Sequence, residues 1–396
     1  MKHCVFDKKC GGCEYIHVPY EEQLAAKKKY VQDLFPDHTA EDVIGMKDPY
    51  HYRHKVYASF YLDRKGKMHA GLYQEHSHKR IDSVMCLIQN KTANDILHEM
   101  CVLAETMKIP VYDEDRGTGV LRHAYIRVSE ATGNILLVIV IGGKSLPSSR
   151  NFVKALTEKF PKIRSVVLNY NHERTSMVLG RKEDILYGKG YITDSIGGID
   201  FRISSRSFYQ VNPLQTEVLY AKALELADLK ESDTVLDACC GIGTITLLAA
   251  KQCRYAYGVE INPQAIRDAI ENAKQNNIRN VYFKADDAGH FITSMKEKPD
   301  VIIMDPPRSG MSEEFLDTAC RMKPSRMVYV SCNPETQARD AAYLLKRGYH
   351  ISRIIPVDNF PFTKHVETVC CLYHQKNDFI SVPYEPKDAD YLKQLK

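Results

Sequence analysis

Short apolar runs alternate with longer amphipathic stretches along the second half of the chain. From residue 205 onwards, each β-branched run is followed by a segment whose apolar residues recur at helical spacing. The predicted strands cover residues 234–237, 256–261, 281–285, 301–305, 327–331, 351–357 and 367–373. Because strands that alternate with helices form a parallel, doubly wound sheet, this half predicts an α/β fold.

The first half shows a different pattern, in which short strands are separated by turns. Its clearest apolar run covers residues 135–141, and two glycines follow that run. Asn212-Pro213 begins the first helix of the second half, because Asn caps a helix and Pro suits its first turn. We therefore divide the chain into an α+β domain at 1–204 and an α/β domain at 205–396.

The composition is that of an ordinary globular protein, with 44% hydrophobic and 26% charged residues. A net charge of +4 permits an anionic partner, but any such surface must be local. The sequence has no apolar leader and no run long enough to cross a membrane, so we expect a cytoplasmic protein. In that compartment the twelve cysteines stay reduced and serve metal binding, catalysis or burial. No obligate protein partner is predicted.

A nucleoside-binding pattern follows the strand at 234–237. Gly241 and Gly243 let the backbone approach a ligand, Thr244 starts a helix, and Glu260 ends the next strand. That spacing places a carboxylate where it accepts hydrogen bonds from ribose hydroxyls. Since the third glycine of a dinucleotide motif is missing, a nucleoside such as S-adenosylmethionine fits better. Either Asp286 or Asp287 contacts its adenine, or each merely caps a helix.

Cys332 ends the apolar strand at 327–331, directly before Asn333-Pro334. A thiolate adds well to an activated double bond, and a polar strand edge favours a lower thiol pKa. The alternative is a buried, inert cysteine. Glu367 opens the last apolar strand, where a carboxylate is either a general base or a structural partner.

A cysteine cluster lies near the start of the chain. Cys4, Cys10 and Cys13 have the spacing of metal ligands, and Cys86 and Cys101 compete for the fourth position. Four cysteines fit either structural zinc or an iron–sulfur cluster, and composition does not choose between them.

Four segments resemble the motif set of the RNA uracil-5-methyltransferases, the RumA/TrmA family. They are residues 207–212 (SFYQVN), 305–310 (DPPRSG), 331–334 (SCNP) and 365–367 (HVE). The resemblance implies a Rossmann-like S-adenosylmethionine-dependent methyltransferase domain with a mostly parallel, seven-stranded sheet. It also implies that the Cys332 thiolate adds to C6 of a uracil, that C5 is methylated, and that Glu367 removes the C5 proton.

The same resemblance implies that Gln210, Glu260 and Asp305 line the cofactor or target pocket. Together with the nucleoside-binding pattern it gives the expected cofactor-binding set. These residues are Gln210, Cys239, Gly241, Thr244, Glu260, Asp287 and Asp305. The family usually has an aromatic residue where this chain has Cys239, which puts one stacking contact in doubt. A target base must leave its stack to reach Cys332, and extrusion is easiest from a structured RNA loop.

The N-terminal segment is similar to that of the family members that modify ribosomal RNA. The similarity implies a [4Fe-4S] cluster held by Cys4, Cys10, Cys13 and Cys86, and a loop uridine of 23S rRNA as the target. The cluster would be a structural staple, because methyl transfer moves no electron. As in the shorter rRNA branch, no N-terminal β-barrel RNA-binding (TRAM) domain is expected. We also expect RNA contact at residues 50–55 and 76–80, which mix aromatic and basic side chains.

Four other functions compete with this interpretation. A tRNA uracil-5-methyltransferase would use the same chemistry on another RNA. An amino-group methyltransferase would use Asp305-Pro306-Pro307 and need no cysteine. A cytosine-5 methyltransferase has its cysteine in other motifs, and an RNA-binding iron–sulfur protein would not catalyse a reaction.

Overall fold

The computed structural model describes residues 2–75, 77, 79–175 and 177–374, and these contain two seven-stranded sheets and a separate hairpin. The first sheet has the order β3-β2-β1-β4-β5-β6-β7, antiparallel except for the pair β5 and β6. Its strands are β1 (Lys55–Leu62), β2 (Met68–Tyr73), β3 (Arg80–Asp82), β4 (Leu121–Val128), β5 (Ile135–Ile141), β6 (Ile163–Tyr170) and β7 (Lys182–Gly188). Helices α3 (Lys91–Thr106) and α4 (Ser149–Lys159) pack on one face. This arrangement is the α+β pattern predicted for the first half.

The second sheet has the order β12-β11-β10-β13-β14-β16-β15. The strands from β12 to β14 are parallel, and β16 is antiparallel to both of its neighbours. Its strands are β10 (Thr234–Ala238), β11 (Tyr255–Glu260), β12 (Val281–Ala285), β13 (Val301–Met304), β14 (Arg326–Ser331), β15 (Tyr349–Val357) and β16 (Glu367–His374). The predicted methyltransferase-type fold is therefore confirmed, with strand ends within two residues of those expected.

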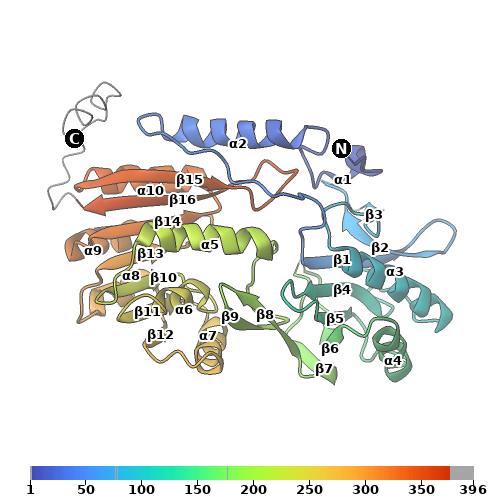
Figure 1. The fold of residues 1–396 in the computed structure, drawn as a ribbon. Coiled ribbons are helices and arrows are strands. Elements are labelled where there is room, and N and C mark those ends of the chain that lie inside the picture. Colours follow the sequence, from blue (N-terminus) through green and yellow to red (C-terminus); the bar gives the residue numbers. More distant parts are fainter. Residues whose placement is uncertain (1, 76, 78, 176, 375–396) are drawn as a thin grey trace, which may run out of the picture.

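Helices cover both faces of the second sheet (Figure 1). They are α5 (Pro213–Ala227), α6 (Thr244–Ala250), α7 (Pro263–Gln275), α8 (Ala288–Ser294), α9 (Glu313–Met322) and α10 (Pro334–Leu345). Asn212, Asn262 and Asn333 each cap a helix that begins with Pro, because their side-chain oxygens accept hydrogen bonds from backbone N–H groups. These caps end the preceding segments sharply, and two of them follow Glu260 and Cys332 closely.

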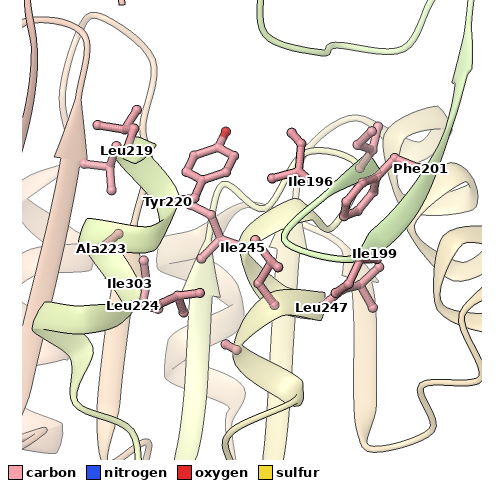
Figure 2. Close-up of a cluster of buried hydrophobic side chains, with 14 of the residues drawn as sticks. Ile196, Ile199, Phe201, Leu219, Tyr220, Ala223, Leu224, Ile245, Leu247 and Ile303 are labelled. Atoms are coloured by element: carbon pink, nitrogen blue, oxygen red, sulfur yellow. The ribbon is translucent and has the colours of Figure 1, made fainter. Parts of the chain in front are cut away.

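A hairpin of β8 (Tyr191–Ile196) and β9 (Ile199–Ser204) lies between the two sheets (Figure 1). Alternate residues of β5 face opposite ways, so Leu136 and Val138 join the hairpin while Leu137 and Ile139 join α3 and α4. The hairpin in turn packs against α5 and α6 (Figure 2). One continuous apolar core thus connects the sheets and fixes their relative position.

The N-terminal segment lies against the second sheet. It contains α1 (Asp7–Cys10) and α2 (Tyr20–Leu34), and α2 runs along β15 and α10 (Figure 1). Ala40 and Ile44 form bridges to β15, so the segment covers that edge of the sheet. The boundary at 204/205 stays a prediction, and these contacts tie the start of the chain to the second sheet. None of the helices within the described ranges has the length and apolar character needed to span a membrane.

A buried ion pair fixes α2 to the loop between β15 and β16. The Lys27 ammonium lies 2.6 Å from Asp358 Oδ1, and both side chains are almost fully buried. The Tyr20 hydroxyl donates a 2.8 Å hydrogen bond to Asp358 Oδ2. Burial lowers the pKa of Lys27, and the Asp358 carboxylate opposes that shift. Removing either partner leaves the other charge buried without compensation.

We expect Lys27→Met to lower the free energy of unfolding by about 3 kcal/mol, because it leaves the buried Asp358 carboxylate without an opposite charge, with hydrogen bonds from Tyr20 and the Phe360 N–H only. Urea denaturation followed by circular dichroism measures this change. The matched control is Lys28→Met, since Lys28 is paired with the exposed Asp42, and no measurable change is expected there. Equal stability of the two variants would contradict a structural role for the buried pair.

Candidate active site

A cavity of about 1130 Å³ opens at the carboxyl ends of β10, β11, β13 and β14. Ligands bind at this edge of open α/β sheets. The cavity brings together every catalytic and cofactor residue predicted from the sequence. They are Gln210, Cys239, Gly241, Thr244, Glu260, Asp287, Asp305, Cys332 and Glu367.

Strand register places Glu367 next to Cys332. Ser331 of β14 pairs with Thr368 of β16 in the antiparallel ladder. One step further, Cys332 comes level with Glu367, and directly opposed side chains lie on the same face about 5 Å apart between their Cβ atoms. Sequence motifs 35 residues apart therefore meet because β16 is inserted between β14 and β15.

Glu367 is buried and holds its proton more tightly than an ordinary carboxyl group. Burial is the main cause and the charge of Asp305 adds to it, so the pKa of Glu367 rises to about 8. The Asn359 amide and the Arg308 guanidinium act in the opposite direction. Burial also raises the pKa of Asp305, to about 7. Near neutral pH, these carboxyl groups can therefore exchange protons, as a general base must.

The Cys332 thiol does not have the lowered pKa that its position at a polar strand edge favoured. Burial raises its pKa, and the carboxylates of Glu367 and Asp305 raise it further. Arg308 lowers it by its charge and by a hydrogen bond. The Asn333 side chain donates a 3.0 Å hydrogen bond to the Arg308 carbonyl and so ties the Asp-Pro-Pro-Arg segment to the cysteine. The sequence predicted both carboxylates as site residues but not their effect on the thiol pKa, because they come from other strands and reach Cys332 only through the fold.

The other end of the cavity fits a nucleoside. A Cβ added at Gly241 would point into open space, and its φ of +55° suits glycine. Gly241 N–H donates a 3.2 Å hydrogen bond to Glu260 Oε2, and Asn262 N–H donates a 2.9 Å bond to Oε1. These bonds hold the carboxylate at the cavity wall, where it can accept hydrogen bonds from ribose hydroxyls.

Two further cavity residues, Asp287 and Cys239, differ in what they can do at the cofactor site. Asp287 lines the cavity and also caps α8, since its Oδ1 accepts a 2.8 Å hydrogen bond from Gly289 N–H. The two interpretations of Asp287 are thus compatible. Burial and the nearby carboxylates raise the pKa of Cys239 to about 12. Cys239 is therefore a neutral thiol at physiological pH and a poor nucleophile.

Two cavity residues were not singled out from the sequence. Tyr220 on α5 points its hydroxyl away from the aliphatic cluster around it (Figure 2), and burial and Asp305 raise its pKa well above the usual range. Asp237 on β10 accepts a 2.6 Å hydrogen bond from Thr246 through Oδ2. Its Oδ1 is buried without a hydrogen-bond partner in the described part of the chain, and it is an acceptor suited to a cofactor amine or hydroxyl. Thr216 lies one turn before Tyr220 on α5, and both are buried and line the cavity. Two hydroxyl groups on the buried face of one helix were the available sequence signal.

A smaller cavity of about 40 Å³ lies near the N-terminus, and the four predicted cluster ligands line it. They are Cys4, Cys10, Cys13 and Cys86. Cys101 lies elsewhere, on the buried face of α3 in the core of the first sheet. Burial and the charges of the other cysteines raise the pKa of Cys13 to about 12. Among the residues that the structure describes, no group of three or more His, Cys, Asp or Glu is placed to bind a metal ion.

Comparison with known proteins identifies the family. Residues 19–375 match the family tRNA (uracil-5-)-methyltransferase. An uncharacterized RNA methyltransferase of Halalkalibacterium halodurans is 43% identical over 378 residues, which cover 93% of this chain and 82% of the relative. A Staphylococcus aureus RNA methyltransferase, also uncharacterized, is 38% identical over 375 residues, covering 92% and 83%.

The crystal structure of Pyrococcus abyssi tRNA (uracil-54, C5)-methyltransferase with S-adenosyl-L-homocysteine is similar throughout. Its TM-score is 0.78 at 28% identity, over 92% of this chain and 86% of that chain. S-adenosylmethionine is thus the methyl donor that fits the nucleoside end of the cavity. The chain belongs to the tRNA (uracil-5-)-methyltransferase family and is an RNA methyltransferase that acts on uracil C5.

Proposed function

We propose that this enzyme methylates a loop uridine of 23S rRNA at C5 through a covalent bond between Cys332 and C6. The observation that carries this proposal is the register that brings Cys332 level with Glu367 inside the large cavity. A nucleophile and a base on one face, beside a nucleoside site, suit addition to a uracil ring. Gln210, Cys239, Gly241, Thr244, Glu260, Asp287 and Asp305 are the proposed cofactor and pocket residues.

The reaction begins when the Cys332 thiol gives its proton to water and its sulfur donates an electron pair to C6. The C5–C6 double bond opens, and C5 becomes the carbanion-like end of an enolate. The C5 carbon would take the methyl group of S-adenosylmethionine as its S–CH3 bond breaks, and S-adenosylhomocysteine would leave as a neutral thioether. The Glu367 carboxylate then removes the C5 proton, and the released electron pair restores the double bond and expels the Cys332 thiolate.

A cationic side chain in the cavity stabilises the thiolate that this cycle forms. Arg308 stabilises the Cys332 thiolate by its charge, which offsets the effect of Glu367 and Asp305. An extruded base excludes water from the site, so these interactions act in a low dielectric. An amino-group methyltransferase would need neither the Cys332 nucleophile nor a base for a carbon-bound proton. A cytosine-5 methyltransferase would use the same adduct, and the family resemblance disfavours it because its cysteine lies in other motifs.

Two observations bear on which RNA is modified. The four cysteines around one cavity favour ribosomal RNA, because the sequence resemblance associates this cluster with the rRNA-modifying branch. The structural similarity to a tRNA enzyme favours tRNA as the alternative. The 76–80 patch bears on neither, since residues 76 and 78 lie outside the described residues.

We expect 5-fluorouridine RNA to trap the enzyme, because Glu367 cannot remove fluorine from C5. Fragments of 23S rRNA and tRNA carrying this base are incubated with enzyme and S-adenosylmethionine, then separated on a denaturing gel. A resistant complex with an rRNA fragment is expected, and Cys332→Ala should abolish it. A complex with tRNA alone would identify the alternative substrate. Methylation by Cys332→Ala would overturn the covalent mechanism.

Activity should rise with pH from about 7 to about 9. Both proposed groups act without their protons, and the pKa values of Cys332 and Glu367 are raised. Raising the pH therefore increases the active fraction, so kcat/KM for the RNA climbs. Glu367→Gln should lower kcat by about 100-fold or more and remove the part of the rise near pH 8. Steady-state rates across this range measure it, and a profile that falls with pH would contradict these assignments.

Four cysteines around one small cavity support the proposal of a [4Fe-4S] cluster. The cavity lining supplies four thiols, and the raised pKa values of Cys13 and Cys86 reflect crowded, partly buried sulfurs that a cation would stabilise as thiolates. The nearby Arg53 guanidinium has the effect expected of a cation, because its charge lowers the pKa of both Cys13 and Cys86. Cys4, Cys10, Cys13 and Cys86 would hold the cluster, which would supply cross-links between segments far apart in the chain.

Cys86→Ser should lose bound iron, and Cys101→Ser should keep it. Of these two cysteines, Cys86 lines the small cavity and Cys101 does not. Iron and acid-labile sulfide are measured after anaerobic reconstitution of the full-length protein. About four of each per chain are expected for the unmodified enzyme. Zinc without sulfide would refute the iron–sulfur assignment, and iron loss in Cys101→Ser would refute the ligand set.

A further inference from the structure

An exposed aromatic ring stands at the opening of the large cavity. Phe208 lines that cavity, yet it is 63% exposed. A single exposed apolar side chain needs no explanation on an ordinary surface. This ring instead belongs to the cavity wall, two residues before Gln210. A nucleotide that enters or leaves the cavity can therefore stack on Phe208.

The backbone on both sides of Phe208 is anchored to the first sheet. The Arg127 guanidinium donates a hydrogen bond to the Ser207 carbonyl, and the N–H of His54 donates a 2.8 Å bond to the Val211 carbonyl. Arg127 lies on β4, and His54 directly precedes β1. The ring is therefore held in place before any RNA arrives, so that binding does not have to order this loop.

A lysine ammonium lies beside this ring without a carboxylate partner. Lys55 Nζ is 5.4 Å from the centroid of the Phe208 ring. Lys55 also stands directly opposite Arg127 in the antiparallel ladder of β1 and β4, and like charges in that position cost stability. Burial, Arg127 and Arg53 all lower the pKa of Lys55, to about 8, and no acidic group in the described part of the chain opposes them. An anion is the partner that Lys55 lacks.

Two arginines of the cavity wall differ from Lys55 in this respect. Arg206 Nη2 lies 3.5 Å from Glu183 Oε1, so its charge is paired. Arg308 acts on the Cys332 thiol by its charge and by a hydrogen bond. The charge of Lys55, in contrast, is not compensated within the described residues. The uncompensated cation thus lies beside the exposed ring.

This arrangement divides the predicted RNA contacts at residues 50–55. Tyr52 is only 2% exposed, and its hydroxyl donates a 3.1 Å hydrogen bond to the Pro361 carbonyl. The prediction is therefore wrong for Tyr52, because aromatic residues at a surface and in a core look alike in sequence. Lys55, at the other end of the segment, has the position that a contact with RNA requires.

We propose that Phe208 and Lys55 bind the nucleotide next to the target uridine, with its base stacked on the ring and its phosphate at the ammonium. This inference rests on the proposed function only for the uridine in the cavity. Stacking accepts any base, because every base presents a π face, so the pair suits an unpaired strand rather than a duplex. The phosphate supplies the negative charge that offsets the repulsion between Lys55 and Arg127. The flanking nucleotide is thus held while the uridine turns into the cavity.

Phe208→Leu should raise the Kd for RNA by about 10-fold, because leucine keeps apolar volume but lacks the face on which a base stacks. Phe208→Tyr keeps that face and should bind RNA as the unmodified enzyme does. Fluorescence anisotropy with labelled 23S rRNA fragments and labelled tRNA measures both variants. S-adenosylmethionine is left out, so that no methyl group is transferred during the titration.

Lys55→Met should make RNA binding less sensitive to salt. The slope of log Kd against log salt concentration should fall by about 0.7, as expected for the loss of one phosphate contact with a single strand. The melting temperature should stay level or rise, since the repulsion from Arg127 is removed. A lysine with a purely structural role would give the opposite pattern, with lower stability and an unchanged slope.

Tyr282→Leu and Lys284→Met are the matched controls for these two substitutions. Tyr282 is 45% exposed, Lys284 is also exposed, and both lie on β12 at the far edge of the second sheet (Figure 1). Neither of them lines the large cavity. Both variants should keep the Kd and the salt dependence of the unmodified enzyme.

The outcomes separate these contacts from the methylation mechanism. Binding of RNA by Phe208→Leu at the unmodified affinity, or an unchanged salt slope in Lys55→Met, would overturn the proposed contacts. An equal loss of affinity in the β12 variants would overturn them as well. Weaker binding by Phe208→Leu together with no adduct on any 5-fluorouridine RNA would support the contacts and overturn the methylation mechanism instead.

Discussion

The antiparallel pairing of β16 with β14 is the constraint on which this active site depends. Parallel strands bring their carboxyl ends to one edge, and that rule alone accounts for Glu260, Asp305 and Cys332. Glu367 stands at the amino end of its strand, so a parallel β16 would place it at the opposite edge. The reversed strand puts Glu367 level with Cys332. A shift of one residue in the pairing of β14 with β16 would turn the Glu367 side chain to the other face of the sheet.

Burial then determines what these groups can do. Glu367 and Asp305 lie in a poorly solvated cavity, so their pKa values rise to about 8 and about 7. The same burial makes Cys332 a weaker acid than an exposed thiol, and Arg308 partly compensates. The continuous core between the sheets keeps this cavity rigid, since β5, the hairpin and α5 share one cluster of apolar side chains.

The cysteines show how one residue type acquires different chemistry from its surroundings. Cys332 faces an arginine at a strand end, Cys239 lies among carboxylates, and Cys370 and Cys371 are buried within β16. The four near the N-terminus share a cavity of their own. Burial and neighbouring charge therefore set what each thiol can do.

The sequence by itself determined the local elements and the chemistry that each one carries. Alternating strands and helices, three Asn-Pro caps and the Gly241–Glu260 spacing follow from short-range rules, and the motifs supplied Cys332 and Glu367. It did not determine the raised pKa of Cys332, the unpartnered oxygen of Asp237 or the burial of Tyr52. Those properties depend on which distant segments meet, and only tertiary packing decides that, because desolvation and contact act through space rather than along the chain.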